Sequence, residues 1–451
     1  MISPPGPEAQ ASEGVAAEGA PTGPAIGLLV NPVAGLGARV ALKGSDGAQV
    51  QARARELGAV PAATGRAAQA LVELTARLPP GTAAPRLLTA AGAMGEDAAH
   101  AAGLSAQCVH DPGPGPTTAA DTARAVAALL AAGARLLLFA GGDGTARDVL
   151  DAMPGGLHAP AVEAAGTTEE AAGTTEEAVG TTASPRTDAA DGSPVRPRDG
   201  SGRLGVPVVG IPAGVKMHSA VFGVHPRAAG QAAAAWIAGR AGVKDAEVMD
   251  RDEEALRAGR VVTRLYGWLP VPDEPVRIQQ RKTGSSAPDP DAVAGIAAGL
   301  AERVGAGALV VLGPGTTTRA VAAALGAHDA TLAGVDVLRV ESAGPRPAAR
   351  VVLADARADQ LLLQPDPWIA LSPIGGQGFL LGRGNQQVSP GLLRATGRER
   401  LAVLATETKL AALGGRPLLV DTGDPVLDEE LSGYVRVITG RRSTAMHLLS
   451  P

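Results

Sequence analysis

The stretch LLLFAGGDGT at residues 136–145 decides the fold. A continuously apolar run meets two glycines, an aspartate, a third glycine and a threonine, and the ARDVLDAM that follows has helical spacing. The pattern predicts a buried strand, a tight loop and a helix start. Glycines let a bulky anion approach backbone N–H groups, and the helix start presents further N–H groups to the same place. The loop therefore favours a phosphorylated ligand, and Asp143 is its only acid, placed to handle a proton or a metal ion.

The same arrangement of an apolar run, a glycine-rich turn and a helical stretch occurs three more times. The further apolar runs cover residues 26–30, 206–211 and 308–312, and they lead into NPVAGLG, PAG and GPGTTT. Repetition of this unit predicts an α/β architecture with largely parallel strands. Because ligands bind beyond the carboxyl ends of such strands, we expect the four glycine loops to converge on one cleft.

Composition limits the class of protein. The chain has 451 residues, enough for two or three domains, with a formal net charge of −5 and 3 Trp, 2 Tyr and 3 Phe. The lack of a basic stripe and the small number of aromatic residues for base stacking disfavour a dedicated nucleic-acid binder. No apolar run reaches the roughly 18 residues of a membrane span, so no membrane partner is expected. A single cysteine excludes an internal disulfide framework and fits a reducing cytoplasm.

Two local expectations concern single residues. Cys108 is expected to be a small, buried apolar residue, which is the usual place of a free cysteine. In the DPGPGPTTAAD segment, Thr118 or Asp121 is predicted to cap the helix that follows.

Shifts in composition divide the chain. Residues 1–23 read as a disordered tail, and residues 24–241 as an N-terminal α/β nucleotide-binding domain. Residues 155–204 interrupt that domain with a low-complexity stretch in which EAAGTTE recurs, which favours a disordered insertion over an interaction segment. Residues 242–451 form a mixed α/β, β-rich C-terminal domain that completes the cleft. Its last segment either stays in that domain or returns to the first one.

Four segments together resemble the ATP-NAD kinase family, in particular the branch that includes acetoin-catabolism protein X. They read VNPVAGLGARVALKGSDG, GGDGTARDV, GIPAGVKMHSAVF and GGQGFLLGRGNQQVSP, at residues 30–47, 141–149, 210–222 and 375–390. GGDGT alone also resembles diacylglycerol and sphingosine kinases, whereas GGDGT together with the two downstream segments matches this branch strongly.

The resemblance implies a Rossmann-like N-terminal domain and a second domain, with the active site between them. It implies transfer of the γ-phosphoryl group of ATP to the 2′-hydroxyl of NAD, with Mg²⁺ bridging ATP oxygens. Asp143 would be the base for that hydroxyl, while Gly141, Gly142, Gly144 and Thr145 would hold phosphate groups. The implied partners are nucleotide substrates. Assembly into a homo-oligomer is an open alternative.

Further candidate residues each have an ordinary structural explanation beside the ligand-binding one. A strand-ending turn, a solvated lysine or a helix cap accounts for them as well as contact with the nucleotide does. These candidates are Asn31, Gly214, Lys216, Gly315, Thr316, Gly384 and Asn385. His218 is expected to be an ordinary helix histidine.

One departure from the family leaves the acceptor open. The Asn-Glu pair that usually follows GGDGT in NAD kinases is missing, and the acids Asp250, Asp252, Glu253 and Glu254 are offered as occupants of a comparable place or as a solvated turn. Three hypotheses follow. The first is an ATP-dependent NAD kinase, the second is a lipid kinase, and the third is a nucleotide-binding sensor without catalysis.

Overall fold

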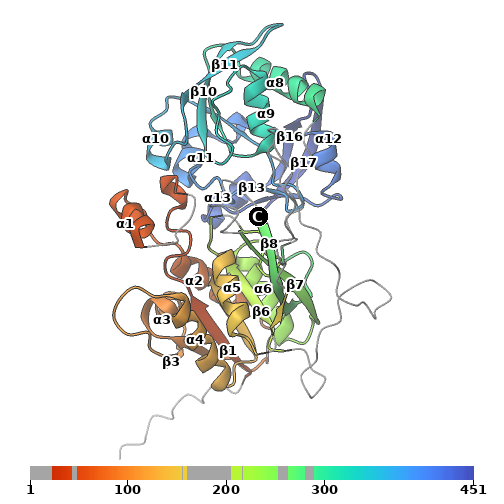
Figure 1. Ribbon diagram of the computed structural model, residues 1–451. Coiled ribbons are helices and arrows are strands. Elements are labelled where there is room, and N and C mark those ends of the chain that lie inside the picture. Colours follow the sequence, from red (N-terminus) through yellow and green to blue (C-terminus); the bar gives the residue numbers. More distant parts are fainter. Residues whose placement is uncertain are drawn as a thin grey trace, which may run out of the picture.

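A computed structural model describes residues 23–42, 48–154, 156–159, 205–215, 217–251, 263–279 and 289–451. Two lobes lie one above the other, and the C-terminus lies where they meet (Figure 1). The expected tail falls outside the described residues except for Gly23, and the expected insertion does so except for residues 156–159. Lys216 also falls outside the described residues.

The first lobe is built on a five-stranded sheet with the order β3-β2-β1-β4-β6, in which every neighbouring pair is parallel. The strands are β1 (Ala25–Val30), β2 (Arg86–Ala90), β3 (Gln107–His110), β4 (Leu136–Gly141) and β6 (Val208–Pro212). The side chains of β1, β4 and β6 are buried along their whole length. Continuous apolar runs of this kind are typical of parallel strands covered on both faces, as predicted.

Helices cover this sheet. They are α1 (Ala48–Glu56), α2 (Ala63–Arg77), α3 (Glu96–Ala101), α4 (Ala119–Ala131), α5 (Asp143–Ala152) and α6 (Pro226–Ile237), with 3₁₀ turns at Ala38–Val40 and Gly92–Met94. On α2, residues 67, 70, 71 and 74 are buried, which is the i, i+3, i+4, i+7 spacing of one helix face. Thr118 caps α4 in a capping box with Asp121, so that prediction is confirmed.

A three-stranded antiparallel sheet extends the first lobe. It has the order β5-β8-β7, with β5 (Leu157–His158), β7 (Val243–Arg251) and β8 (Thr263–Pro272). Val248, Leu269 and Val271 are fully buried and belong to the same hydrophobic core as the parallel sheet. We therefore propose that the boundary between the domains follows Ile278, which also packs in this core, rather than Gly242.

The second lobe contains a nine-stranded mixed sheet with the order β11-β10-β9-β12-β14-β16-β17-β15-β13. Its strands are β9 (Leu309–Leu312), β10 (Asp336–Ser342), β11 (Ala348–Leu353), β12 (Trp368–Leu371), β13 (Phe379–Leu381), β14 (Leu401–Leu404), β15 (Leu418–Val420), β16 (Gly433–Ile438) and β17 (Thr444–Ser450). The helices are α8 (Pro290–Val304), α9 (Thr316–Ala324), α10 (Ala358–Leu362), α11 (Pro390–Thr396), α12 (Glu407–Ala411) and α13 (Pro425–Leu431), with a 3₁₀ turn at Arg398–Arg400. The final strand, β17, pairs with β16 and β15 inside this sheet.

Helices on both faces bury this second sheet. Along β9, Leu309 and Val311 pack in one core, while Val310 and Leu312 pack in another with residues of α8 and α9. The split follows the two-residue period of a strand, whose successive side chains point to opposite faces. The predicted class is confirmed: a Rossmann-like α/β domain and a second mixed α/β, β-rich domain.

Three expectations are wrong. His218, expected to be an ordinary helix histidine, lies in the irregular segment between β6 and α6. The GPGTTT loop follows β9, so it belongs to the second sheet and not to the parallel sheet that carries the other three glycine loops. Cys108 is exposed, because it lies on β3, the short strand at the edge of the first sheet. Within the described residues, no helix is long and apolar enough to cross a membrane.

Candidate functional site

Three glycine loops meet at the carboxyl edge of the parallel sheet. A Cβ atom placed on Gly214 would lie 2.8 Å from the Cα atom of Gly142, and one on Gly35 would lie 2.1 Å from the carbonyl oxygen of Ala213. Gly35 also has a φ of +70°, a conformation that glycine adopts without strain. The loops after β1, β4 and β6 therefore touch backbone to backbone. Convergence is confirmed for these three loops.

Substitution of Gly214 by alanine tests this contact. The new methyl group meets the backbone of Gly142, so we expect the free energy of unfolding to fall by about 1–3 kcal/mol, which is typical of overpacking. Urea titration measures the loss. Gly65→Ala is the matched control, since Gly65 lies within α2 with open space around it, and alanine there should be neutral or stabilising. Equal stability of both variants would contradict the close approach.

Asp143 is the first residue of α5 and is only 6% exposed. One carboxylate oxygen accepts hydrogen bonds from the Ser219 backbone N–H at 3.0 Å and from the Ser219 hydroxyl at 2.6 Å. The other oxygen accepts from the His218 backbone N–H at 2.7 Å and lies 3.1 Å from Nδ1 of the His218 ring. The helix N-terminus favours a negative charge at this position. The carboxylate is therefore fixed in place against residues 218 and 219.

Asn31 and Thr145 connect the first loop to the GGDGT loop. The Asn31 side-chain amide donates to the Thr145 hydroxyl at 2.9 Å, and its carbonyl oxygen accepts from the Val33 backbone N–H at 3.2 Å. A Cβ atom on Gly141 would lie 2.4 Å from the Thr145 side chain, so a side chain at that position would displace the threonine. Asn31 thus positions Thr145 at the start of α5.

Three glutamine side chains hold the segment 213–219 and form what we call the glutamine ladder. Gln386, Gln377 and Gln279 donate to alternate carbonyl oxygens, those of Val215 at 2.7 Å, Met217 at 3.1 Å and Ser219 at 2.5 Å. Gln377 and Gln386 come from the second lobe, so that lobe helps to shape the segment that binds Asp143. The sequence analysis missed this role, although both glutamines lie inside the quoted GGQG and GRGNQQ motifs.

Of the remaining predicted site residues that the structure describes, only Gly384 contacts the segment beside Asp143. The Gly384 backbone N–H donates to the Val215 carbonyl at 2.9 Å, which places its loop against the segment 213–219. The side-chain amide of Asn385 closes its own loop. Its oxygen accepts from the Gly382 backbone N–H, and its nitrogen donates to the Leu380 carbonyl. Gly315 and Thr316 begin α9 in the second sheet. Lys216 lies outside the described residues.

The acids offered in place of the missing Asn-Glu pair are described only in part. Asp250 forms an ion pair with Arg147 of α5 at 3.1 Å. Its carboxylate lies 4.0 Å from a Cβ atom placed on Gly144, beside the GGDGT loop. Asp252, Glu253 and Glu254 fall outside the described residues.

A buried charge cluster, here called the interlobe clasp, joins the lobes through Arg66, Arg383 and Asp421. Asp421 forms ion pairs with Arg66 of α2 and with Arg383 of the second lobe. Arg66 also donates to the Pro212 carbonyl, and Arg383 donates to Val224 O at 3.0 Å. Burial alone would raise the pKa of Asp421, but the two arginines lower it to about 2.

His225 caps α6 beside the clasp and makes stability depend on pH. Burial lowers its pKa to about 4, against the opposing pull of Asp421. Its Nδ1 accepts a hydrogen bond from Ala228 N at 3.1 Å, so the neutral ring serves as the cap. Unfolded histidine titrates near 6.5, so this stability is present above about pH 6.5 and is lost as pH falls towards 4.

We expect His225→Asn to remove up to about 3 kcal/mol of pH-dependent stability between pH 6.5 and 4, because asparagine also caps helices but does not titrate. Urea unfolding of wild type and variant across this range measures the difference. Burial raises the pKa of the nearby Asp428 to about 6, so its titration makes the protein more stable as pH falls. This contribution is the same in wild type and variant and cancels when their unfolding free energies are compared. Parallel pH profiles would contradict the assignment.

Comparison with known proteins finds a family match for the second lobe. Residues 310–448 match the family model described as ATP-NAD kinase C-terminal domain. Comparisons with curated proteins and with solved structures gave no match. The matched range runs from β9 to β17 and includes Gln377, Gly384 and Gln386, which contact the segment beside Asp143. The second lobe is thus similar to the C-terminal domain of ATP-NAD kinases, and this supports placing the chain in the ATP-NAD kinase family.

Proposed function

We propose that this protein is an ATP-dependent kinase that phosphorylates a nucleotide hydroxyl, with the 2′-hydroxyl of NAD as acceptor. The observation that carries the proposal is the contact between the family-matched lobe and the segment that holds Asp143. Within the family, we propose the branch that includes acetoin-catabolism protein X, which the four quoted sequence segments favour.

Phosphoryl transfer requires positioning of the reactants and stabilisation of charge more than covalent chemistry by the protein. We propose that backbone N–H groups at the start of α5, including those of Gly144 and Thr145, bind phosphate oxygens, since the first N–H groups of a helix have no partner within it. A Cβ atom placed on Gly144 would meet nothing nearer than Asp250 Oδ2 at 4.0 Å, so the backbone at this helix start is open to a phosphate chain. This is the arrangement that a polyphosphate needs.

Asp143 and His218 form the proton-accepting pair in this proposal. A carboxylate is a weak base towards a sugar hydroxyl, so the proton leaves late, as the new O–P bond forms. The His218 ring nitrogen lies 3.1 Å from Asp143, which orients the ring as carboxylates orient histidines in other sites. Both Asp143 oxygens already have two partners each, so in this proposal the proton is accepted by Nε2 of His218, the ring nitrogen that does not face Asp143.

Two acceptor oxygens without partners in the described structure fit a nucleotide. Among the described residues, Gln279 and Gln386 each have a buried amide oxygen without a hydrogen-bond partner, and both lie against the segment 213–219. A nucleotide supplies hydroxyl and amino donors for such oxygens. Mg²⁺, when bound with ATP, neutralises phosphate charge and keeps mostly phosphate and water ligands. No three His, Cys, Asp or Glu side chains gather as ligands in the described part of the chain, and we assign none.

An acceptor panel tests the proposal. Purified protein is incubated with Mg²⁺ and ATP against NAD, adenosine and dispersed diacylglycerol, and phosphorylated products are separated. We expect NADP from NAD. Phosphorylation of diacylglycerol alone would replace the proposal with a lipid kinase. Nucleotide binding by calorimetry without any product would replace it with a sensor.

A further inference from the structure

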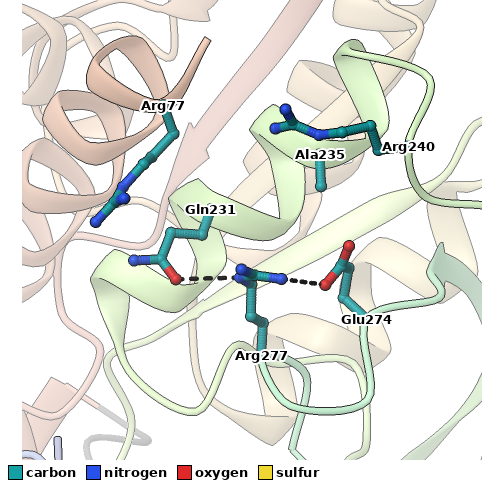
Figure 2. Close-up of a pocket in the computed structure, with 6 residues that line it drawn as sticks. All are labelled: Arg77, Gln231, Ala235, Arg240, Glu274 and Arg277. Carbon is teal, nitrogen blue, oxygen red and sulfur yellow. Dashed lines mark hydrogen bonds and ion pairs between the residues drawn. The ribbon is translucent and has the colours of Figure 1, made fainter. Parts of the chain in front are cut away.

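A cavity of about 530 Å³ lies in the first lobe, away from the glycine loops. Figure 2 shows it beside α6, and its lining residues are Arg77, Gln231, Ala235, Arg240, Glu274 and Arg277. Arg77 ends α2 and Arg240 follows α6, whereas the interlobe clasp lies near the first residues of these helices. The cavity is therefore separate from the site around Asp143.

A hydrogen-bond network holds the cavity wall in shape. Glu73 accepts from Arg77 at 2.7 Å and from Gln231 at 2.8 Å through one oxygen, and from Arg227 at 3.2 Å through the other. Burial would raise the pKa of Glu73, but the hydrogen bonds from Gln231, Arg77 and Arg227 lower it. Glu73 therefore stays charged and fixes these donors.

Positive charge exceeds negative charge in this wall. Arg277 pairs with Glu274 and donates to the Gln231 side-chain oxygen at 3.1 Å (Figure 2). The Arg240 guanidinium has no hydrogen bond or ion pair with any described residue, and Arg240 is exposed. The lining residues thus include three arginines and one glutamate, and Glu73 binds Arg77 from behind the wall. The excess occurs in a chain whose formal net charge is −5.

We propose that this cavity binds a small anion with two or more adjacent phosphate groups. Guanidinium groups bind phosphate through paired N–H donors, and the unpaired charge of Arg240 gives the first contact. Arg77 and Arg277 are already oriented by Glu73 and Gln231, which lowers the entropic cost of binding. The volume lies within the range of about 300–1,000 Å³ typical of small-molecule sites.

Calorimetry with sodium tripolyphosphate and the full chain tests the proposal. We expect R77A/R240A to raise the Kd of this site at least tenfold, and added salt to weaken binding to wild type. The matched control is R55A/R135A, which removes the same charge from two exposed arginines outside the cavity. All four arginines are exposed, so both variants should fold, and their melting temperatures verify this.

Hydrogen exchange separates this cavity from the site around Asp143, which also attracts phosphates. Tripolyphosphate should protect residues 231–240 and 274–279 in wild type, and this protection should vanish in R77A/R240A but not in the control. Protection restricted to residues 141–146 and 213–219 would overturn the proposal. Equal weakening in both double variants, or no binding to wild type, would overturn it as well.

Discussion

Asp143→Asn is expected to lower NADP formation by about 10²- to 10⁴-fold, the range that a positioned acid or base contributes. The substitution keeps the size of the side chain but removes its negative charge. An asparagine can still accept from Ser219, whereas its amide N–H₂ would face the His218 N–H, where Asp143 now accepts at 2.7 Å. Initial rates with MgATP and NAD, read through a coupled dehydrogenase, measure the loss.

Asp151→Asn is the matched control for charge. Asp151 lies on the same helix, its side chain is 60% exposed, and its loss should leave the rate within twofold of wild type. Nucleotide binding by calorimetry then separates chemistry from folding, since a folded Asp143→Asn protein should still bind ATP. Turnover of that variant near the wild-type rate would remove Asp143 from the mechanism.

Asp421→Asn carries the largest expected effect on stability. The side chains of Asp421 and Arg383 are each 3% exposed and that of Arg66 is 12% exposed, so the substitution leaves two buried guanidinium groups without their shared ion-pair partner. Breaking a buried ion pair from one side typically costs about 3–5 kcal/mol. Urea unfolding at pH 7 measures the free energy, and we expect a loss in that range.

A surface pair provides the control for this second prediction. Asp366 pairs with Arg400 at 2.6 Å, but its side chain is 73% exposed, so Asp366→Asn should cost less than about 1 kcal/mol. The lowered pKa of Asp421, about 2, sets the pH range over which the clasp stabilises the protein. Its stabilising effect is complete above the ordinary carboxyl pKa near 4 and is lost as pH falls through 2. Similar losses for both variants would show that the clasp does not hold the lobes.

Local sequence patterns predicted the scaffold. An apolar run followed by glycines specifies a buried strand and a tight turn within about ten residues, and this sufficed for β1, β4 and β6 and for the approach of their loops. The capping of α4 by Thr118 is equally local. Such signals need no knowledge of which segments become neighbours, so a single sequence carries them.

Contacts between distant segments could not be predicted in the same way. Arg66 and Asp421 are 355 positions apart, and neither lies in a motif that marks it as half of an ion pair. The glutamine ladder depends on which carbonyls of residues 213–219 face the second lobe. Cys108 is exposed because β3 is an edge strand, and strand order is a property of the whole sheet. The GPGTTT loop lies in the second sheet, and this too follows from strand order, which no single stretch of sequence specifies.

Under the proposed function, the glutamine ladder bears on hydrolysis of the phosphoryl donor by water. Gln377 and Gln386 reach across from the second lobe to Met217 and Val215, in the same segment that carries the partners of Asp143. If the lobes part, these two bonds break, whereas Gln279 and Asp143 of the first lobe still hold residues 218 and 219. Under the proposed function, the two glutamines would hold residues 215 and 217 in place for transfer only while the lobes are together, which would limit hydrolysis of the phosphoryl donor.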